Sequence, residues 1–403
     1  MRFLCASILF LLIFPACAKR AGVNLVKIEV NEVENGEIAV IIDPFRVRAD
    51  EIASSLDDRL LAAQVLVCGT DGRGRLPSSM KTLFAECPAG AVILFRYNLD
   101  TENDSIRAFV AETVSLIRDE SGLPPFIAVD QEGGVVDRFR RGDATLPAAY
   151  SYWELFMAKG KDAALEKIEA DSLRAGREIN GLGINLNFAP VAEYLTTDNS
   201  AFLESRSYGP DPLFTAEAAS VFVRGMEQAG VLCVIKHFPA SAGPDPHFSS
   251  SSLNLDKPAL DSLVYPFAAL FKNGARAVMA AHTAVPAIDS EISSLSAAVM
   301  GNWLRGELGF DGIIISDDFS MAAARSASSS AGRTAGRQTP EEAAIRSIAA
   351  GADMVLVWPS DIRRAHRAFV SALEDGRLSR ERLEEAASRV IYEKLKMGLI
   401  NGE

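Results

Sequence analysis

The 403-residue sequence has few cysteines, and their spacing excludes two common roles. It holds five, and no two of them form a Cys-x-x-Cys pair. Cys68, Cys87 and Cys233 are far apart, which predicts neither a zinc site nor a disulfide framework. Cys68 and Cys233 lie in apolar runs, so we expect them to pack as small core residues. No metal ion or organic cofactor is therefore expected.

Positive charge is also scarce. The chain has 41 lysines and arginines against 53 aspartates and glutamates, a formal net charge of −12. Because phosphate backbones attract basic surfaces, this balance argues against a nucleic-acid partner and favours a neutral small molecule or a sugar. Hydrophobic residues make up 48% of the chain and charged residues 23%, which predicts a packed globular core.

The apolar run at the N-terminus is too short to span a bilayer stably. Arg2 precedes it, Phe3 to Phe14 is almost wholly apolar, and Pro15-Ala16-Cys17-Ala18 supplies small residues for cleavage. We expect residues 1–18 to be an export signal that sends the chain to the periplasm or cell envelope. Two processing routes stay open: cleavage after Ala18, or a lipid on Cys17 that attaches the chain to a membrane.

Eight short apolar, β-branched runs alternate with helix-like stretches. Near-continuous apolar strands are typical of parallel sheets covered on both faces. A strand followed by a helix, repeated eight times, predicts a closed (β/α)8 barrel of the TIM type, with a doubly wound open sheet as the alternative. The runs are Val65–Gly69, Ala91–Phe95, Phe126–Asp130, Ile184–Phe188, Leu232–Lys236, Ala277–His282, Gly312–Asp317 and Met354–Trp358.

The barrel is expected to fill residues 51–403 as a single, monomeric catalytic domain. Residues 19–50 contain an alternating run broken at Asn35-Gly36, a hairpin signal, so we expect an N-terminal extension that lies against the barrel. Residues 323–339 form a Ser/Ala/Gly/Arg-rich loop for which a lid and a plain surface loop both stay open. Thr339 is expected to cap a helix that begins at Pro340.

Charged or imidazole groups end four of the predicted strands. Barrel enzymes build their sites at the C-terminal ends of several strands, so this pattern favours a barrel enzyme over an open sheet. We also expect His282 to line the pocket. The groups are Asp130, Lys236-His237, His282 and Asp317-Asp318.

Carboxylates and one histidine provide candidates for acid–base chemistry. A retaining glycosidase needs a nucleophile and a proton donor, usually two carboxyl groups. Asp317 is the candidate nucleophile, whereas Asp318 is expected to cap the following helix. Asp245 and His247 flank Pro246 in the turn-rich loop after the fifth run. A carboxylate beside a histidine orients the ring and stabilises its cation, which suits an acid/base pair.

Five blocks of the sequence resemble glycoside hydrolase family 3, and more narrowly its single-domain β-N-acetylglucosaminidases of peptidoglycan turnover. The first block is Ile-Ala-Val-Asp-Gln-Glu-Gly-Gly-Val-Val-Asp-Arg-Phe-Arg, residues 127–140. All five occur in the family's order between about residues 55 and 395. The other four are Leu-Gly-Ile-Asn-Leu-Asn-Phe-Ala-Pro (182–190), Glu-Ser-Arg-Ser-Tyr-Gly (204–209), Lys-His-Phe-Pro (236–239) and Ile-Ser-Asp-Asp-Phe-Ser-Met (315–321).

The resemblance implies a role for each matching residue. It implies that Asp317 is the nucleophile and forms a covalent glycosyl–enzyme intermediate. It implies that Asp245 and His247 are the Asp-x-His dyad of this subfamily, in which histidine replaces the usual carboxylic acid as acid/base. Sugar-binding positions are implied for Asp130, Arg138, Arg206, Lys236 and His237.

One loop departs from the family pattern. After Lys-His-Phe-Pro the family usually continues with Gly-His-Gly, but this chain has Ala240-Ser241-Ala242-Gly243, and its dyad follows slightly earlier. We expect a retaining β-N-acetylhexosaminidase that hydrolyses terminal β-linked N-acetylglucosamine from peptidoglycan fragments or chitin-type oligosaccharides. The alternatives are an envelope sugar-binding protein with weakened turnover, a β-glycoside phosphorylase and a β-glucosidase of the same family.

Overall fold

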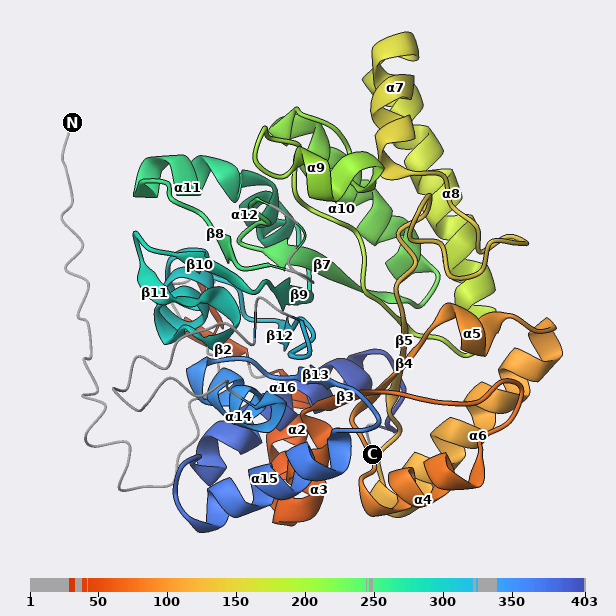
Figure 1. The fold of residues 1–403 in the computed structure, drawn as a ribbon, viewed down its shortest axis with the longest axis vertical. Coiled ribbons are helices and arrows are strands. Elements are labelled where there is room, and N and C mark those ends of the chain that lie inside the picture. The colour runs from red at the N-terminus through yellow and green to blue at the C-terminus, as the bar shows by residue number, and fades with distance from the viewer. Residues whose placement is uncertain are drawn as a thin grey trace.

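The computed structural model describes residues 29–32, 38–41, 43–243, 245, 249–321, 324 and 339–401. At its centre is an eight-stranded sheet in which each neighbouring pair of strands is parallel. Helices surround this sheet (Figure 1). In chain order the strands are β3 (Leu66–Gly69), β4 (Ala91–Leu94), β5 (Phe126–Val129), β6 (Leu186–Asn187), β7 (Leu232–Phe238), β9 (Ala277–Ala280), β12 (Ile313–Ser316) and β13 (Val355–Val357).

The sheet closes between its first and last members, β12 and β13. The Met354 amide donates to the Ile314 carbonyl oxygen (3.1 Å), and the Ser316 amide donates to the Met354 carbonyl oxygen (3.0 Å). Ile315 and Met354 form a parallel bridge, while β13 pairs with β3 on its other side. The predicted (β/α)8 barrel is therefore confirmed and the open-sheet alternative is wrong. Each predicted run coincides with one strand, although β7 extends two residues past its run to Phe238.

Alternate residues of the strands form two apolar layers. One layer packs outward against the helices, for example Leu66, Val92 and Ile127. The other layer draws residues from all eight strands into one cluster, which places it inside the barrel. That inner cluster includes Val67, Ile93, Phe126, Ala128, Leu186, Val234, Met279, Ile315 and Met354.

Helices connect consecutive strands around the barrel. The predicted cap of α14 is confirmed, since the Thr339 hydroxyl accepts from the Glu342 amide (3.3 Å). The helices between and after the strands are α3 (Asp58–Gln64), α4 (Ser78–Glu86), α5 (Arg96–Leu99), α6 (Asn103–Ser121), α7 (Ala149–Lys159), α8 (Lys161–Gly181), α9 (Ser200–Leu203), η1 (Glu204–Arg206), α10 (Pro212–Gln228), α11 (Lys257–Leu263), α12 (Tyr265–Lys272), η2 (Ser293–Leu295), η3 (Ala298–Glu307), α14 (Pro340–Ala350), α15 (Ile362–Glu374) and α16 (Arg380–Lys396).

Two smaller units accompany the barrel. A three-stranded sheet, in the order β11 (Asp289–Ile292), β10 (Thr283–Val285) and β8 (Ser251–Ser252), follows the ends of β7 and β9. Near the N-terminus, β1 (Glu29–Glu32) and β2 (Ile38–Ile41) pair antiparallel on either side of Asn35-Gly36, as the hairpin signal predicts.

The helix α2 (Pro44–Ser55) begins at the cap residue Asp43 and crosses the boundary placed at residue 50. It packs against α16: the Arg46 guanidinium lies 4.0 Å from the centre of the Tyr392 ring, and the Tyr392 hydroxyl donates to Asp43 Oδ2 (2.7 Å). Within the described part of the chain, no helix combines the length and apolarity needed to cross a membrane.

The three cysteines that the structure describes are buried and form no disulfide. Cys68 and Cys233 are at most 1% exposed within the core, as the sequence predicts. Burial raises the pKa of both thiols, which keeps them protonated and unreactive.

Candidate active site

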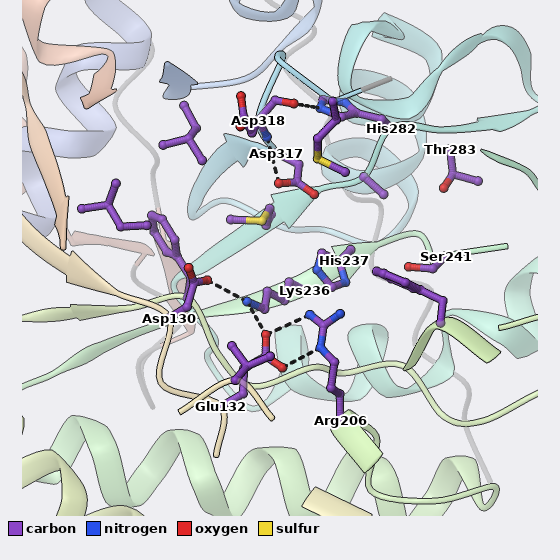
Figure 2. A pocket seen from close by; sticks show the side chains of 18 of the residues that line it. Asp130, Glu132, Arg206, Lys236, His237, Ser241, His282, Thr283, Asp317 and Asp318 are labelled. Atoms are coloured by element: carbon purple, nitrogen blue, oxygen red, sulfur yellow. Dashed lines mark hydrogen bonds and ion pairs between the residues drawn. The ribbon is translucent and has the colours of Figure 1, made fainter. Parts of the chain in front are cut away.

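A cavity of about 240 Å³, lined by both charged and apolar side chains, lies at the C-terminal mouth of the barrel. Its wall includes residues that directly follow or end strands β5, β7, β9 and β12, which is where barrel enzymes place their sites. Figure 2 shows Asp317 facing Lys236, His237 and Arg206 across this space. Six of the residues predicted from the sequence line it: Asp130, Arg138, Arg206, Lys236, His237 and Asp317.

One side of the cavity is a lattice of alternating charges. Lys236 Nζ lies 3.0 Å from Asp130 Oδ1 and 2.7 Å from Glu132 Oε1. Arg138 Nη2 donates to Asp130 Oδ2 (3.1 Å). Arg206 grips Glu132 with two parallel hydrogen bonds, Nε to Oε2 (2.8 Å) and Nη2 to Oε1 (2.9 Å). Bidentate pairing of this kind fixes direction as well as distance.

The lattice keeps its members charged. Burial by itself would raise the pKa of Asp130, but the charges of Lys236 and Arg138 outweigh it and hold the pKa below its usual value. Burial would also raise the pKa of Glu132, but the charges of Lys236 and Arg206 outweigh this effect and lower its pKa strongly. Burial would lower the pKa of Lys236, yet the two carboxylates raise it. The wall therefore offers firm ionic donors and acceptors, which suits the hydroxyl groups of a sugar.

The turn after β5 holds Asp130 and Glu132 in place through the buried side chain of Gln131. The Gln131 amide nitrogen Nε2 donates to Asp137 Oδ1 (3.0 Å), and its Oε1 accepts from the Arg138 backbone amide (2.8 Å). Gly133 has a φ of 98°, and a Cβ there would lie 2.2 Å from the Pro147 carbonyl oxygen. The chain can make this tight return only with glycine at that position.

Asp317 stands on the opposite side of the cavity, just after β12. Its backbone amide donates to the Ala280 carbonyl oxygen (3.1 Å), which continues the pairing of β12 with β9. Its Oδ1 accepts from the Asp318 amide (2.8 Å). The carboxylate is thus fixed by main-chain contacts at the end of a barrel strand.

Asp318 and His282, which also line the cavity, support this segment. Asp318 accepts from the Ser320 amide (2.7 Å) and from Trp358 Nε1 (2.6 Å). The helix that it is expected to cap is not among the described elements, so that role stays a prediction. His282 Nε2 donates to the Asp318 carbonyl oxygen (3.0 Å), while its Nδ1 contacts Ser294 Oγ (2.7 Å). Burial lowers the pKa of His282, although the charge of Asp317 opposes this. His282 lines the cavity as predicted, and its hydrogen bonds give it a supporting role.

Only one member of the predicted acid/base pair lies within the described residues. Asp245 is described, and its carbonyl oxygen accepts from the Ser249 amide (3.2 Å) and hydroxyl (3.1 Å). It is not among the described residues that line the cavity. His247 lies outside the described residues, so its role stays a prediction.

Two carboxylates of the site were given no binding or positioning role from the sequence. Glu132 was not assigned as a binding residue, although it follows Asp130 by two positions in the first family block and turns to the same lattice. Glu193, 2% exposed, accepts from His237 Nδ1 (2.7 Å). It lies 44 residues from His237 in the chain, so only the pairing of strands brings the two together. Within the described ranges, no group of three or more His, Cys, Asp or Glu is arranged to hold a metal ion.

Known proteins resemble the chain in both sequence and structure. Residues 59–392 match the family described as glycosyl hydrolase family 3 N terminal domain. A β-hexosaminidase of Xylella fastidiosa (strain 9a5c) is 35% identical over 274 residues, which are 66% of this chain and 78% of that protein.

Two solved structures are also similar. A β-N-acetylglucosaminidase of this family from Paenibacillus sp. str. FPU-7 superposes with a TM-score of 0.77 at 29% identity, over 86% of this chain and 63% of that one. This chain therefore spans less than two thirds of the Paenibacillus protein. A β-N-acetylhexosaminidase from Beutenbergia cavernae DSM 12333 gives 0.72 at 28% identity, over 84% and 99%.

Proposed function

The chain belongs to glycosyl hydrolase family 3, whose members cut O-glycosyl bonds, and within that class we propose that it is a retaining β-N-acetylhexosaminidase. It removes terminal β-linked N-acetylglucosamine from peptidoglycan fragments or chitin-type oligosaccharides. Asp317 attacks the anomeric carbon while the glycosidic C–O bond breaks and the aglycone oxygen leaves with a proton from the general acid. Water then hydrolyses the covalent glycosyl–enzyme and frees Asp317.

The placement of Asp317 opposite the charge lattice carries this proposal. Asp317 lies on one wall and the charged groups Lys236 and Arg206 lie on the other (Figure 2). A sugar ring bound between these walls would meet the nucleophile on one side and hydroxyl-binding groups on the other. Lys236 and Arg206 donate to sugar oxygens, and Asp130 accepts from hydroxyls. Buried polar groups of this kind discriminate strongly, because a ligand without the matching hydroxyl leaves them unpaired.

The size of the cavity supports removal of a single terminal sugar. Its volume of about 240 Å³ is below the roughly 300–1,000 Å³ of pockets for drug-sized ligands. The names of the relatives, β-hexosaminidase and β-N-acetylglucosaminidase, support N-acetylglucosamine as that sugar.

Water, rather than phosphate, suits the acceptor site. The three cations that line the described cavity, Arg138, Arg206 and Lys236, are each paired with Asp130 or Glu132. The acidic Asp318 also lines the space. Asp317 is esterified and uncharged when the acceptor attacks, so a phosphate ion would meet three cations balanced by three carboxylates and no net positive charge, which favours hydrolysis over phosphorolysis.

We assign proton transfer to His247, with Asp245 as its orienting partner. A general acid contributes about 10²–10⁴-fold when the leaving group needs a proton. A His247→Ala variant is expected to lose most turnover of sugar-linked substrates. With a dinitrophenyl glycoside it should release a burst of phenol and then turn over slowly. Equal losses on both substrates, with no burst, would place the proton donor elsewhere.

Export through residues 1–18 belongs to the same proposal, with the mature chain in the periplasm or cell envelope. Mass spectrometry of the mature N-terminus separates cleavage after Ala18 from a lipid on Cys17. Retention of Met1 would contradict both routes.

A panel of nitrophenyl glycosides tests the activity directly. We expect the β-N-acetylglucosaminide to be cut far faster than the β-glucoside, at the same rate with and without added phosphate. Preference for the glucoside would make the protein a β-glucosidase, and a requirement for phosphate would make it a phosphorylase. If calorimetry shows that N-acetylglucosamine binds but no glycoside is cleaved, the protein is a sugar-binding protein with weakened turnover.

A further inference from the structure

A buried carboxylate behind the cavity wall has no part in the mechanism above. Glu193 follows β6, and its segment runs beside the end of β7, where Val191 bridges to Lys236 and the Ala192 amide donates to the Lys236 carbonyl oxygen (2.7 Å). Glu193 is 2% exposed and does not line the cavity, but its neighbours His237 and Ser241 do. It therefore reaches a ligand only through them.

Four hydrogen bonds converge on this carboxylate. Oε1 accepts from His237 Nδ1 (2.7 Å), from the His237 amide (3.2 Å) and from Ser241 Oγ (3.2 Å). Oε2 accepts from the Ser241 amide (2.5 Å). The backbone amides can only donate, so they fix the direction in which the two oxygens accept.

The geometry settles which ring nitrogen of His237 carries a proton. A carboxylate oxygen accepts, so Nδ1 must donate. In a neutral imidazole the second nitrogen, Nε2, then has a lone pair and accepts hydrogen bonds. Because His237 lines the cavity, its neutral ring would present a nitrogen acceptor to a ligand there.

The same carboxylate also holds the start of the loop that carries Asp245 and His247. Beyond Ser241, the backbone of Ala242 is tied by both its amide (3.2 Å) and its carbonyl oxygen (2.8 Å) to Ser251 Oγ. The Ser241 bonds thus keep the carboxylate itself from turning, and the loop base cannot shift without releasing it.

We propose that Glu193 is a positioning residue that fixes His237 with its proton on Nδ1, so that Nε2 accepts a hydrogen bond from a sugar hydroxyl. The inference rests on the proposed function, since that function places a sugar against His237. It adds a specificity element: a hydroxyl on the sugar must donate toward Nε2, and a sugar without that hydroxyl leaves the nitrogen unpaired.

A Glu193→Gln variant tests the idea while keeping side-chain volume. One acceptor oxygen becomes an NH2 donor, which opposes either the Ser241 amide or Nδ1. If it faces Nδ1, the ring proton moves to Nε2. We expect kcat/KM to fall at least about tenfold, as it does when a histidine is held in the wrong tautomer. Glu193→Asp retains a carboxylate and is the matched control, which should keep the proton on Nδ1 and recover part of the rate.

Ring 15N chemical shifts of the full-length protein provide a readout that a merely structural role would not move. The chain has four histidines, so a His237→Asn variant assigns the His237 signals. At pH 8 we expect a protonated Nδ1 and an unprotonated Nε2 in the wild type, and the same pattern in Glu193→Asp. An unprotonated Nδ1 in the wild type, or a ring still protonated on both nitrogens, would overturn the proposal.

The wild-type spectrum needs no variant, so the test holds even if Glu193→Gln does not fold. Addition of N-acetylglucosamine should shift Nε2 of His237 as it accepts a hydroxyl, and a shift confined to the other histidines would also overturn the proposal. Failure of the proposed function would give a different result. No glycoside would then be cut, but the 15N shifts would still report the tautomer of His237 in the free protein.

Discussion

The two ends of the barrel each bury a lysine, and the two lysines behave in opposite ways. At the mouth, Lys236 is 3% exposed and paired with Asp130 and Glu132, which raise its pKa. At the closed end, Lys394 of α16 is fully buried, donates to Gln64 Oε1 (2.9 Å) and lies 5.4 Å from the centre of the Phe126 ring. Burial there lowers the pKa of Lys394 to about 7.

The difference reflects what surrounds each ammonium group. Two carboxylates at the mouth replace the lost hydration of Lys236, so its charge survives burial. At the closed end, no carboxylate of the described chain forms an ion pair with Lys394, and a neutral amine is the cheaper state. Charge is thus maintained where we propose that a sugar binds and suppressed where the barrel only needs to be filled.

The largest expected effect is a loss of activity at the mouth of the barrel without a loss of stability. Asp317→Asn removes the proposed nucleophile with almost no change in volume, so turnover should fall on the order of 10³-fold or more. The urea midpoint should stay close to that of the wild type, because main-chain contacts hold this segment. Asp318→Asn is the matched control, and the assignment is wrong if Asp318→Asn is dead while Asp317→Asn keeps a tenth of the activity.

A second substitution, Lys236→Met, should lower both the stability and the activity. Lys236→Met leaves Asp130 and Glu132 buried with one cation fewer, and breaking such a pair costs about 3–5 kcal/mol of unfolding free energy. Because Arg138 and Arg206 still reach the carboxylates, we expect the lower end of that range. Activity should fall as well, since a donor to the sugar is lost. Urea unfolding at pH 7 measures the first effect and a nitrophenyl glycoside the second; an unchanged midpoint would show that the lattice adds no stability.

The barrel and the mouth could be predicted because their signals are local. Each strand is predicted as a short apolar run of five or six residues, and Asp130, Lys236 and Asp317 stand where such runs end. The buried side chains that hydrogen-bond to the cavity residues could not be predicted in this way. Glu193 meets His237 only because β6 and β7 are neighbours, and nothing in either segment reveals that pairing.

Lys394 did leave a signal in the sequence. It follows Val390 by four residues, and Val390 belongs to the cluster inside the barrel, so helical spacing places the lysine on the same buried stripe. Lysine is almost never fully buried, and a rule based on residue type therefore assigns it to solvent. The periodicity of α16 is the better guide here than the identity of the residue.

The last and smallest effect should have the opposite sign to that of Lys236→Met. Lys394→Met fills the same space without a group that must be deprotonated to be buried, at the loss of one hydrogen bond to Gln64. We expect a gain of about 1–3 kcal/mol in unfolding free energy at pH 7. The sign follows from the pKa, which is about 7 in the folded protein and about 10.4 in the unfolded chain.

Between these two values the unfolded chain binds a proton that the folded protein does not, so the wild type should gain stability as the pH rises from 7 toward 10. The variant lacks this contribution. Its advantage should therefore be greatest at pH 7 and below, and should shrink toward pH 10. Urea unfolding of both proteins at pH 7 and pH 9.5 measures the difference between their unfolding free energies. Groups that titrate alike in the two proteins contribute equally to both and cancel in this difference. A constant difference would mean that Lys394 stays charged when buried, and the contrast between the two ends of the barrel would then lie in packing alone.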